Sequence, residues 1–125
     1  AYREAEELTR SGRTYAGMDS GFAGLNETLN GLNKGELTVL GADTSVGKST
    51  LAKQIAYSVL RGGDAVAYVS QEEPRARVGM RMACLAAGAE VDPDLARRGR
   101  LPAGQRAAYA RARDRLSGLP WWVCG

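Results

Sequence analysis

Residues 41–49 read Gly-Ala-Asp-Thr-Ser-Val-Gly-Lys-Ser, which matches the pattern G-x-x-x-x-G-K-[S/T] of a phosphate-binding loop. The four residues before it, 37–40 (Leu-Thr-Val-Leu), form a short apolar run that predicts a buried strand. After it, Leu51, Ile55 and Val59 recur every fourth residue, as apolar side chains do on one face of a helix. A strand, a glycine-containing loop and a helix in this order predict a nucleotide phosphate site and not a fortuitous glycine-rich turn.

The residue types in this loop suit the chemistry of phosphate binding. Gly41 and Gly47 can take backbone angles closed to other residues, so the loop can wrap around an anion. Its N–H groups would point inward at the positive end of the following helix. The Lys48 ammonium would contact the β- and γ-phosphates, and the Ser49 hydroxyl would ligate Mg²⁺. Asp43 is expected to turn toward solvent, the alternative being that it reaches the metal. The positions expected to contact the nucleotide are Gly41, Ala42, Asp43, Thr44, Ser45, Val46, Gly47, Lys48, Ser49 and Thr50.

Length and composition exclude several classes of protein. The 125 residues suffice for one modest α/β domain, and 44% hydrophobic residues allow a core. The sequence has no run of 18 apolar residues and no targeting peptide, so we expect no membrane segment. Cys84 and Cys124 lie far apart in no metal-binding spacing, and we interpret them as thiols of a reducing cytoplasm. Because histidine is absent, Ser-His-Asp and Cys-His catalysis are excluded.

Charge is distributed unevenly along the chain. Residues 1–73 carry 7 Lys/Arg and 10 Asp/Glu, whereas residues 74–125 carry 10 Arg and 4 Asp/Glu. A basic half invites a nucleic-acid interpretation. No aromatic residues alternate with the arginines to stack on bases, so we favour solvated helix faces and subunit contacts instead.

Apolar runs and helical patterns alternate after the loop. This alternation predicts an α/β fold with a parallel sheet, helices on both of its faces and right-handed crossovers. Ser20 is a candidate N-cap for a helix before the loop. In the helix that follows the second strand, Val78, Met82 and Leu85 are expected to face inward. The expected helices cover residues 20–30, 75–87, 92–98 and 102–116, and further strands cover residues 65–69 and 120–124.

Two glutamates follow the strand expected at residues 65–69. In open parallel sheets, ligands bind at the carboxyl ends of the strands, so Glu72 or Glu73 could orient the water that attacks the γ-phosphate. We favour Glu72. The alternative is that both are surface charges in a turn, which could also cap the helix that begins near Arg75. A second magnesium ligand, the Walker B aspartate that ordinarily follows an apolar run, is not found.

Several segments, in one order, resemble the ATPase domain of DnaB-type replicative DNA helicases, which are RecA-like P-loop proteins. The resemblance runs from about Thr14 to Val123. The family's serine, followed two residues on by its catalytic glutamate, matches Ser70 and Glu72. The segments that carry the resemblance are residues 20–26, 31–37, 41–49 and 69–73, Arg81, residues 91–101 and Leu119-Pro120.

The resemblance implies a RecA-like fold that stops before the Walker B strand. Residues 1–13 would be the end of a linker helix or a docking arm, and residues 14–125 the amino-terminal part of the ATPase domain. It also implies ATP and Mg²⁺ as cofactors, a hexameric ring, and single-stranded DNA bound through regions absent here. The intact protein would unwind DNA in the cytoplasm using ATP, whereas this chain alone would be inactive.

The sequence also departs from the helicase pattern. Gln71 and Glu73 replace the family's usual apolar neighbours of the catalytic glutamate. The paired glutamates resemble those of RadA-like and KaiC-like ATPases, which act in recombination or signalling. Because the Walker B acid is missing, a non-catalytic nucleotide-binding module is a further alternative.

Overall fold

The computed structural model describes residues 6, 10, 12, 14–43 and 46–125. The chain forms two compact units, Ala1–Gly62 and Gly63–Gly125, which we describe separately. Most of the linker-helix end expected at residues 1–13 lies outside the described residues, as do Thr44 and Ser45 of the phosphate loop. None of the helices in the described ranges combines the length and apolarity needed to cross a membrane.

The first unit contains helices α2 (Ala23–Leu29) and α3 (Lys48–Arg61). The segments that precede and follow α2 lie side by side, because Met18 and Leu32 form an antiparallel bridge. Gly17 and Gly31 make this possible, since a Cβ on either would lie less than 3.0 Å from backbone atoms of the opposite segment. The residues that lead into α2 are thus tied to those that leave it.

A buried polar cluster holds the start of α2. The Ser20 hydroxyl donates to Asn26 Oδ1 at 2.7 Å, and the Asn26 amide donates to Asp19 Oδ1 at 2.7 Å. Ser58 of α3 donates to the Asp19 carbonyl at 3.1 Å. The prediction that Ser20 is the N-cap was wrong, because Phe22 occupies that position without a side-chain cap. The serine instead bonds Asn26 inside α2, and its hydroxyl also accepts from the Phe22 N–H at 3.2 Å.

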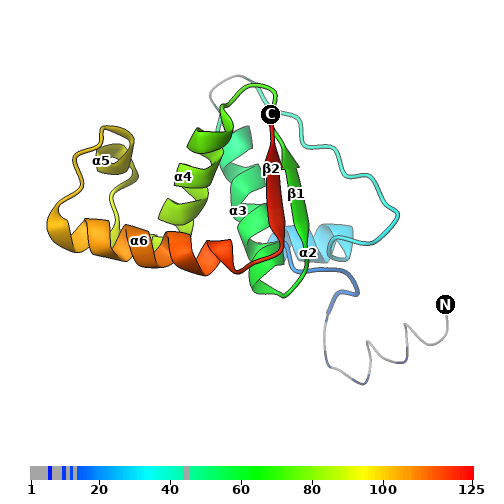
Figure 1. The fold of residues 1–125 in the computed structure, drawn as a ribbon. Coiled ribbons are helices and arrows are strands. Elements are labelled where there is room, and N and C mark those ends of the chain that lie inside the picture. The colour runs from blue at the N-terminus through cyan, green and yellow to red at the C-terminus, as the bar shows by residue number, and fades with distance from the viewer. Residues whose placement is uncertain (1–5, 7–9, 11, 13, 44–45) are drawn as a thin grey trace. The chain divides into compact units, whose positions relative to one another are not determined.

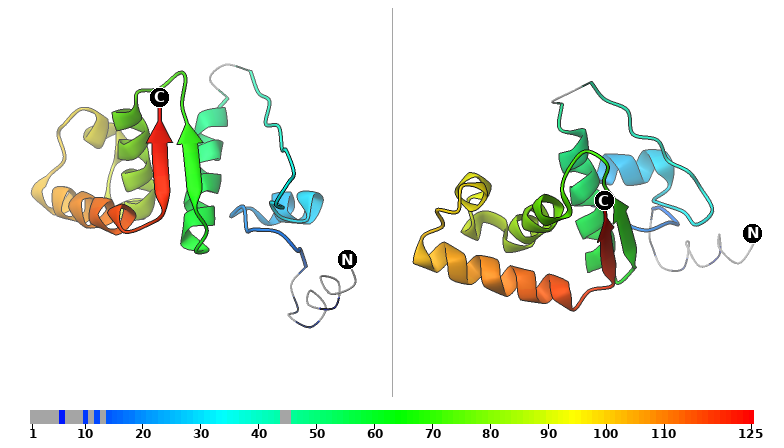
Figure 2. Two further views of the ribbon diagram at one scale, coloured as in Figure 1. Left: turned by 45° about the vertical axis from the view of Figure 1, so that its right-hand side comes forward. Right: turned by 45° about the horizontal axis from the view of Figure 1, so that its top comes forward.

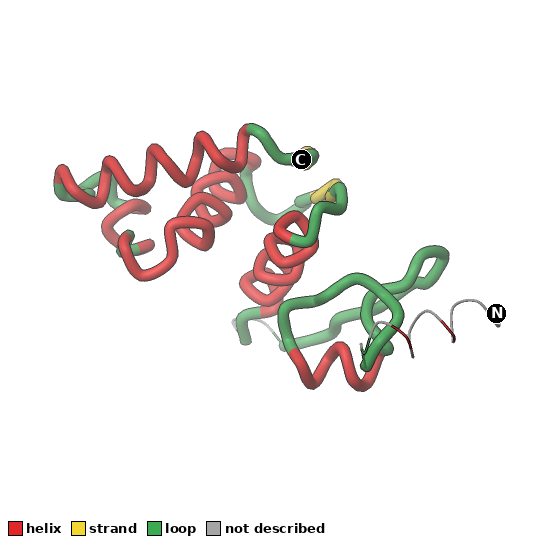
Figure 3. Tube along the Cα trace, turned by 90° about the horizontal axis from the view of Figure 1, so that it is seen from below, coloured by secondary structure: helices red, strands yellow, loops and turns green. Residues whose placement is uncertain are grey.

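The strand expected at residues 37–40 is not formed. This stretch belongs to a loop that runs through residues 33–43 (Figure 3), in which Leu37 is 90% and Val39 82% exposed. A strand requires a neighbouring strand to accept and donate its backbone hydrogen bonds. Within the described residues, the backbone of residues 37–42 makes none. The apolar sequence alone was therefore insufficient to form a strand here.

The second unit alternates strands and helices as expected. Its strands β1 and β2 pair in parallel, with Val66 opposite Trp121 and Val69 opposite Cys124 (Figures 1 and 2). A parallel pair requires a long crossover, here made of helices. The predicted α/β class with a parallel sheet is confirmed. In chain order the elements are β1 (Val66–Val69), α4 (Arg75–Ala87), the 3₁₀ helix η1 (Gly88–Glu90), α5 (Pro93–Arg97), α6 (Ala103–Ser117) and β2 (Trp121–Cys124).

Exposure alternates along both strands of this sheet. Tyr68 and Trp121 are half-buried, whereas Val69 is 70% and Trp122 60% exposed. The side of the sheet that carries Val69 and Trp122 is therefore exposed. In this unit, α4 contacts β2 and covers one face. Helices on both faces of the sheet stay a prediction for the chain as a whole.

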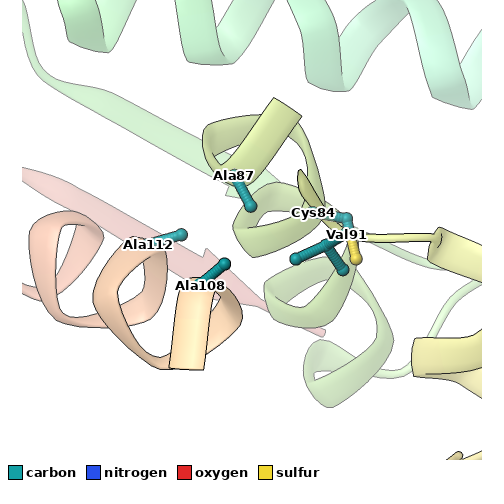
Figure 4. Close-up of a cluster of buried hydrophobic side chains, with 5 residues drawn as sticks. All are labelled: Cys84, Ala87, Val91, Ala108 and Ala112. Carbon is teal, nitrogen blue, oxygen red and sulfur yellow. The ribbon is translucent and has the colours of Figure 1, made fainter. Parts of the chain in front are cut away.

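Helices α4 and α6 pack through small residues. Val78 and Met82 of α4 are buried as predicted, but Leu85 is only half-buried, whereas its neighbour Cys84 belongs to the buried cluster. Small side chains let two helices approach closely and leave little room for extra atoms. The buried cluster between the helices, shown in Figure 4, consists of Cys84, Ala87, Val91, Ala108 and Ala112.

Enlarging this cluster is expected to destabilise the second unit. Ala112 is 0% exposed, so Ala112→Leu forces side chains off their preferred rotamers and lowers the free energy of unfolding by about 1–3 kcal/mol. Urea unfolding followed by circular dichroism measures the change. Ala107→Leu, on the exposed side of α6, is the matched control and is expected to leave the midpoint unchanged. Equal midpoints for the two variants would contradict the packing described here.

Candidate functional site

Gly47 is the N-cap of helix α3 and directly precedes the lysine of the phosphate loop. Gly47 has φ 90° and ψ 20°, in the left-handed region, and its carbonyl accepts the first helical hydrogen bond from the Leu51 N–H at 2.9 Å. A side chain with a Cβ is strained at such angles. Among the described residues other than its two chain neighbours, none has a heavy atom within 4 Å of the position that a Cβ on Gly47 would take. The need for glycine at this position is therefore conformational.

The first turn of α3 has the properties of an anion site. The first N–H groups of any helix have no partner inside the helix, and they form its positive end. No side chain of a described residue caps α3, and no acidic residue lies in its first turn. Lys48 is exposed and Ser49 half-buried at the same end. A phosphate group would satisfy these N–H groups and meet the lysine ammonium.

The amino-terminal half of the loop differs from expectation. Gly41 does not adopt a positive φ, so in this conformation it does not use the backbone angles that only glycine takes readily. Asp43 is exposed, and its carbonyl accepts from the Val46 N–H at 3.4 Å. Val46 is 68% exposed. Of the two predicted special glycines, only the one that begins α3 has the expected geometry.

A turn at the end of β1 carries the two glutamates. The Ser70 N–H donates to the Cys124 carbonyl at 2.8 Å, which extends the pairing of β1 with β2 by one residue. The Ser70 hydroxyl donates to the Glu73 carbonyl at 2.8 Å and accepts from the Glu73 N–H at 3.1 Å. Glu72 lies inside this closed turn, at the carboxyl end of the strand where it was expected. Sequence reasoning gave Ser70 no structural role, although a serine at a strand end often makes such local bonds.

The environments of the two glutamates differ. Glu73 is half-buried, and its negative charge acts on Tyr68 of β1. The pKa of Tyr68 is raised above its ordinary value, first by burial and second by the negative charge of Glu73. Glu72 is exposed and makes no hydrogen bond or ion pair with any described residue, including the first turn of α4. Glu72 does not cap the helix, but its exposed position in a turn also fits the alternative that it is a surface charge.

The predicted site residues divide between the two units. Lys48 and Ser49 belong to the first unit, and Glu72 belongs to the second. Within the first unit the sequence brings the lysine, the serine and the helix N–H groups together, because they are adjacent in the chain. Within the second unit the end of β1 presents Glu72 beside the end of β2.

The residues at the start of α3 fit a magnesium nucleotide. In the described part of the chain, no three His, Cys, Asp or Glu side chains come together to hold a metal ion. Mg²⁺ commonly takes few protein ligands and completes its shell with water and phosphate oxygens. The half-buried Ser49 hydroxyl could supply one such ligand. The negatively charged phosphates of the nucleotide would accept hydrogen bonds from the N–H groups and form an ion pair with Lys48.

Comparison with known proteins gives three findings. A family model described as the DnaB-like helicase C terminal domain matches residues 17–124. The replicative DNA helicase DnaB of Leifsonia xyli subsp. xyli is 29% identical over 124 residues, which is 98% of this chain and 27% of that protein. The DNA repair protein RadA of Campylobacter jejuni subsp. jejuni is 43% identical over 51 residues, which is 41% of this chain and 11% of that protein. The chain spans about a quarter of the length of the first relative and less of the second.

Proposed function

Because this chain belongs to the DnaB-like helicase C-terminal domain family, we propose that it is the ATP-binding portion of a replicative DNA helicase. The intact protein couples ATP hydrolysis to the unwinding of duplex DNA in a hexameric ring. The observation that carries the proposal is the extent of the family match, which includes both the phosphate loop and the glutamates after β1. The left-handed Gly47 at the start of α3 supports it from the structure.

Each predicted site residue has a role in this proposal. Lys48 and the N–H groups of residues 41–50 hold the phosphates of ATP, and Ser49 ligates Mg²⁺. Mg²⁺ neutralises charge on the phosphate oxygens when it is bound. Glu72 orients the attacking water, since it is the glutamate without a partner in the described residues. Glu73 remains beside Tyr68 and helps to shape the turn.

The proposal extends to the fold and to the partners of the intact protein. We assign residues 14–125 to the amino-terminal part of a RecA-like ATPase domain and residues 1–13 to the end of a linker helix. The expected partners are further copies of the same chain and single-stranded DNA, in the cytoplasm. The DNA would be bound by regions outside these residues.

A second candidate is a RadA-like ATPase that acts in DNA repair. It is favoured by the 43% identity with a RadA protein over 51 residues and by the adjacent Glu72 and Glu73. In that case the two glutamates would act as a pair, and unwinding would be absent. The shorter match, 41% of this chain against 98%, favours the helicase.

A strand-displacement assay distinguishes the helicase from the RadA-like ATPase. The intact protein is expected to release a labelled strand from a forked duplex when ATP and Mg²⁺ are present, and to release none with a non-hydrolysable analogue. The matched control is Lys48→Ala, which removes the phosphate contact. ATP hydrolysis without displacement would favour the RadA-like ATPase. Nucleotide binding without hydrolysis would leave only a nucleotide-binding module.

A further inference from the structure

Building on the proposed function, we infer that Ser70 is a positioning residue for the hydrolytic reaction. Its hydroxyl closes the turn from Ser70 to Glu73 and thereby fixes where the chain presents the Glu72 carboxylate. The family comparison assigns no role to this hydroxyl. The inference rests on hydrogen bonds in the second unit alone.

The Ser70 hydroxyl makes two bonds to one residue. It accepts from the Glu73 N–H at 3.1 Å and donates to the Glu73 carbonyl at 2.8 Å. Both hydrogen bonds join Ser70 to Glu73, so two bonds hold the ends of the turn together. A hydroxyl is suited to this task because it donates and accepts at the same time. Alanine would remove both bonds, and threonine would retain them.

The start of the turn is fixed by the neighbouring strand. The Ser70 N–H donates to the Cys124 carbonyl at 2.8 Å, where β2 ends. Gly125 also packs against Ser70, because a Cβ on Gly125 would overlap the Ser70 carbonyl oxygen. The turn therefore begins from a backbone held on two sides. Its far end passes into Pro74, whose φ of −60° and ψ of 145° lead into α4.

Glu72 depends on this turn because nothing else in the described residues holds it. The Glu72 side chain is exposed and makes no hydrogen bond or ion pair with any described residue. Among these residues, the backbone of the turn alone therefore determines where the carboxylate lies. A group that orients water must be placed closely, and a shift of about 1 Å can reduce a rate about 100-fold. Opening the turn would move Glu72, whereas Lys48 and Ser49 of the phosphate loop are not part of the turn.

The test uses steady-state ATP hydrolysis by the intact protein. For Ser70→Ala we expect kcat to fall about 10- to 100-fold while KM for ATP stays within about 2-fold, because orientation of water is lost and phosphate binding is kept. Ser70→Thr retains the hydroxyl and is expected to stay within about 3-fold of the wild type, since threonine makes the same local bonds. Ser70→Cys, which has similar size and a weak hydrogen-bonding group, is expected to behave like alanine.

A matched control and a second readout separate positioning from folding. Ser117 also donates from its hydroxyl to a backbone carbonyl in this unit, at 3.0 Å to Arg113, and Ser117→Ala is expected to keep the wild-type kcat. Hydrogen exchange of the Glu73 amide should be slow in the wild type and in Ser70→Thr, and fast in Ser70→Ala. If Ser70→Ala does not fold, the kcat of Ser70→Cys is compared with that of Ser70→Thr instead.

The outcomes distinguish this inference from the proposed function. Wild-type protein that hydrolyses ATP, together with Ser70→Ala and Ser70→Cys of unchanged kcat, would overturn the positioning role alone. Ser70→Thr as slow as Ser70→Ala would also overturn it, because the hydroxyl would then not be the cause. Wild-type protein that hydrolyses no ATP would overturn the proposed function and this inference with it.

Discussion

Replacing Lys48 by alanine is expected to abolish nucleotide binding or nearly so. The side chain is exposed at the positive end of α3, where its ammonium would meet the β- and γ-phosphates. Hydrogen bonds to charged groups contribute about 1.5–3 kcal/mol each, so losing two of them weakens binding by about 100-fold or more. Isothermal titration with ATP and Mg²⁺ measures the change directly.

The control for Lys48→Ala is another exposed lysine of the same unit. Lys34 lies in the turn that follows α2, away from the start of α3 in the sequence, and Lys34→Ala changes the net charge by the same amount. It is expected to leave the Kd for ATP within about 2-fold, because exposed charges contribute little beyond their immediate contacts. If the two variants bind ATP equally well, the phosphate site is not at this loop.

The second large effect is expected for Glu72→Gln in the intact protein. Glutamine has nearly the same shape but cannot take a proton, so the variant should bind ATP normally. A positioned base contributes about 10²- to 10⁴-fold to a rate, and turnover should fall by about that factor. Comparing the Kd from titration with kcat from phosphate release separates the binding effect from the chemical one.

Glu73→Gln is the matched comparison for this experiment. Glu73 is half-buried beside Tyr68, so its replacement should alter the turn only moderately and leave most of the turnover. A large loss of kcat in Glu73→Gln, with an active Glu72→Gln, would reverse our assignment. Similar losses in both would support the paired glutamates of a RadA-like ATPase.

Local sequence predicted the helices of the second unit well. The prediction for residues 75–87 agrees with α4, because Pro74 precedes the helix and Gly88, at φ 66°, ends it. For the short helix α5, Asp92 caps the Asp94 N–H at 2.9 Å and Pro93 occupies the first turn. These signals act within a few residues and need no distant partner.

Where distant partners matter, prediction from sequence was weaker. Ser20 was expected to cap a helix, but its hydroxyl donates to Asn26 inside α2, in a cluster whose Asp19 carbonyl accepts from Ser58 of the distant α3. Residues 37–40 have the composition of a strand, yet no backbone partner is present for them among the described residues. In both cases the outcome depended on which segments meet, and a pattern along the chain does not contain that information.

For the candidate site, the sequence by itself determined the phosphate loop, because glycine, lysine and serine act there through adjacent positions and through the start of one helix. The tertiary structure alone decided how the turn that carries the glutamates is anchored. The Ser70 N–H donates to the Cys124 carbonyl, so the end of β2 holds the start of the turn. The physical reason is that cross-strand hydrogen bonds join residues far apart in the chain, which become neighbours only when β1 and β2 pair.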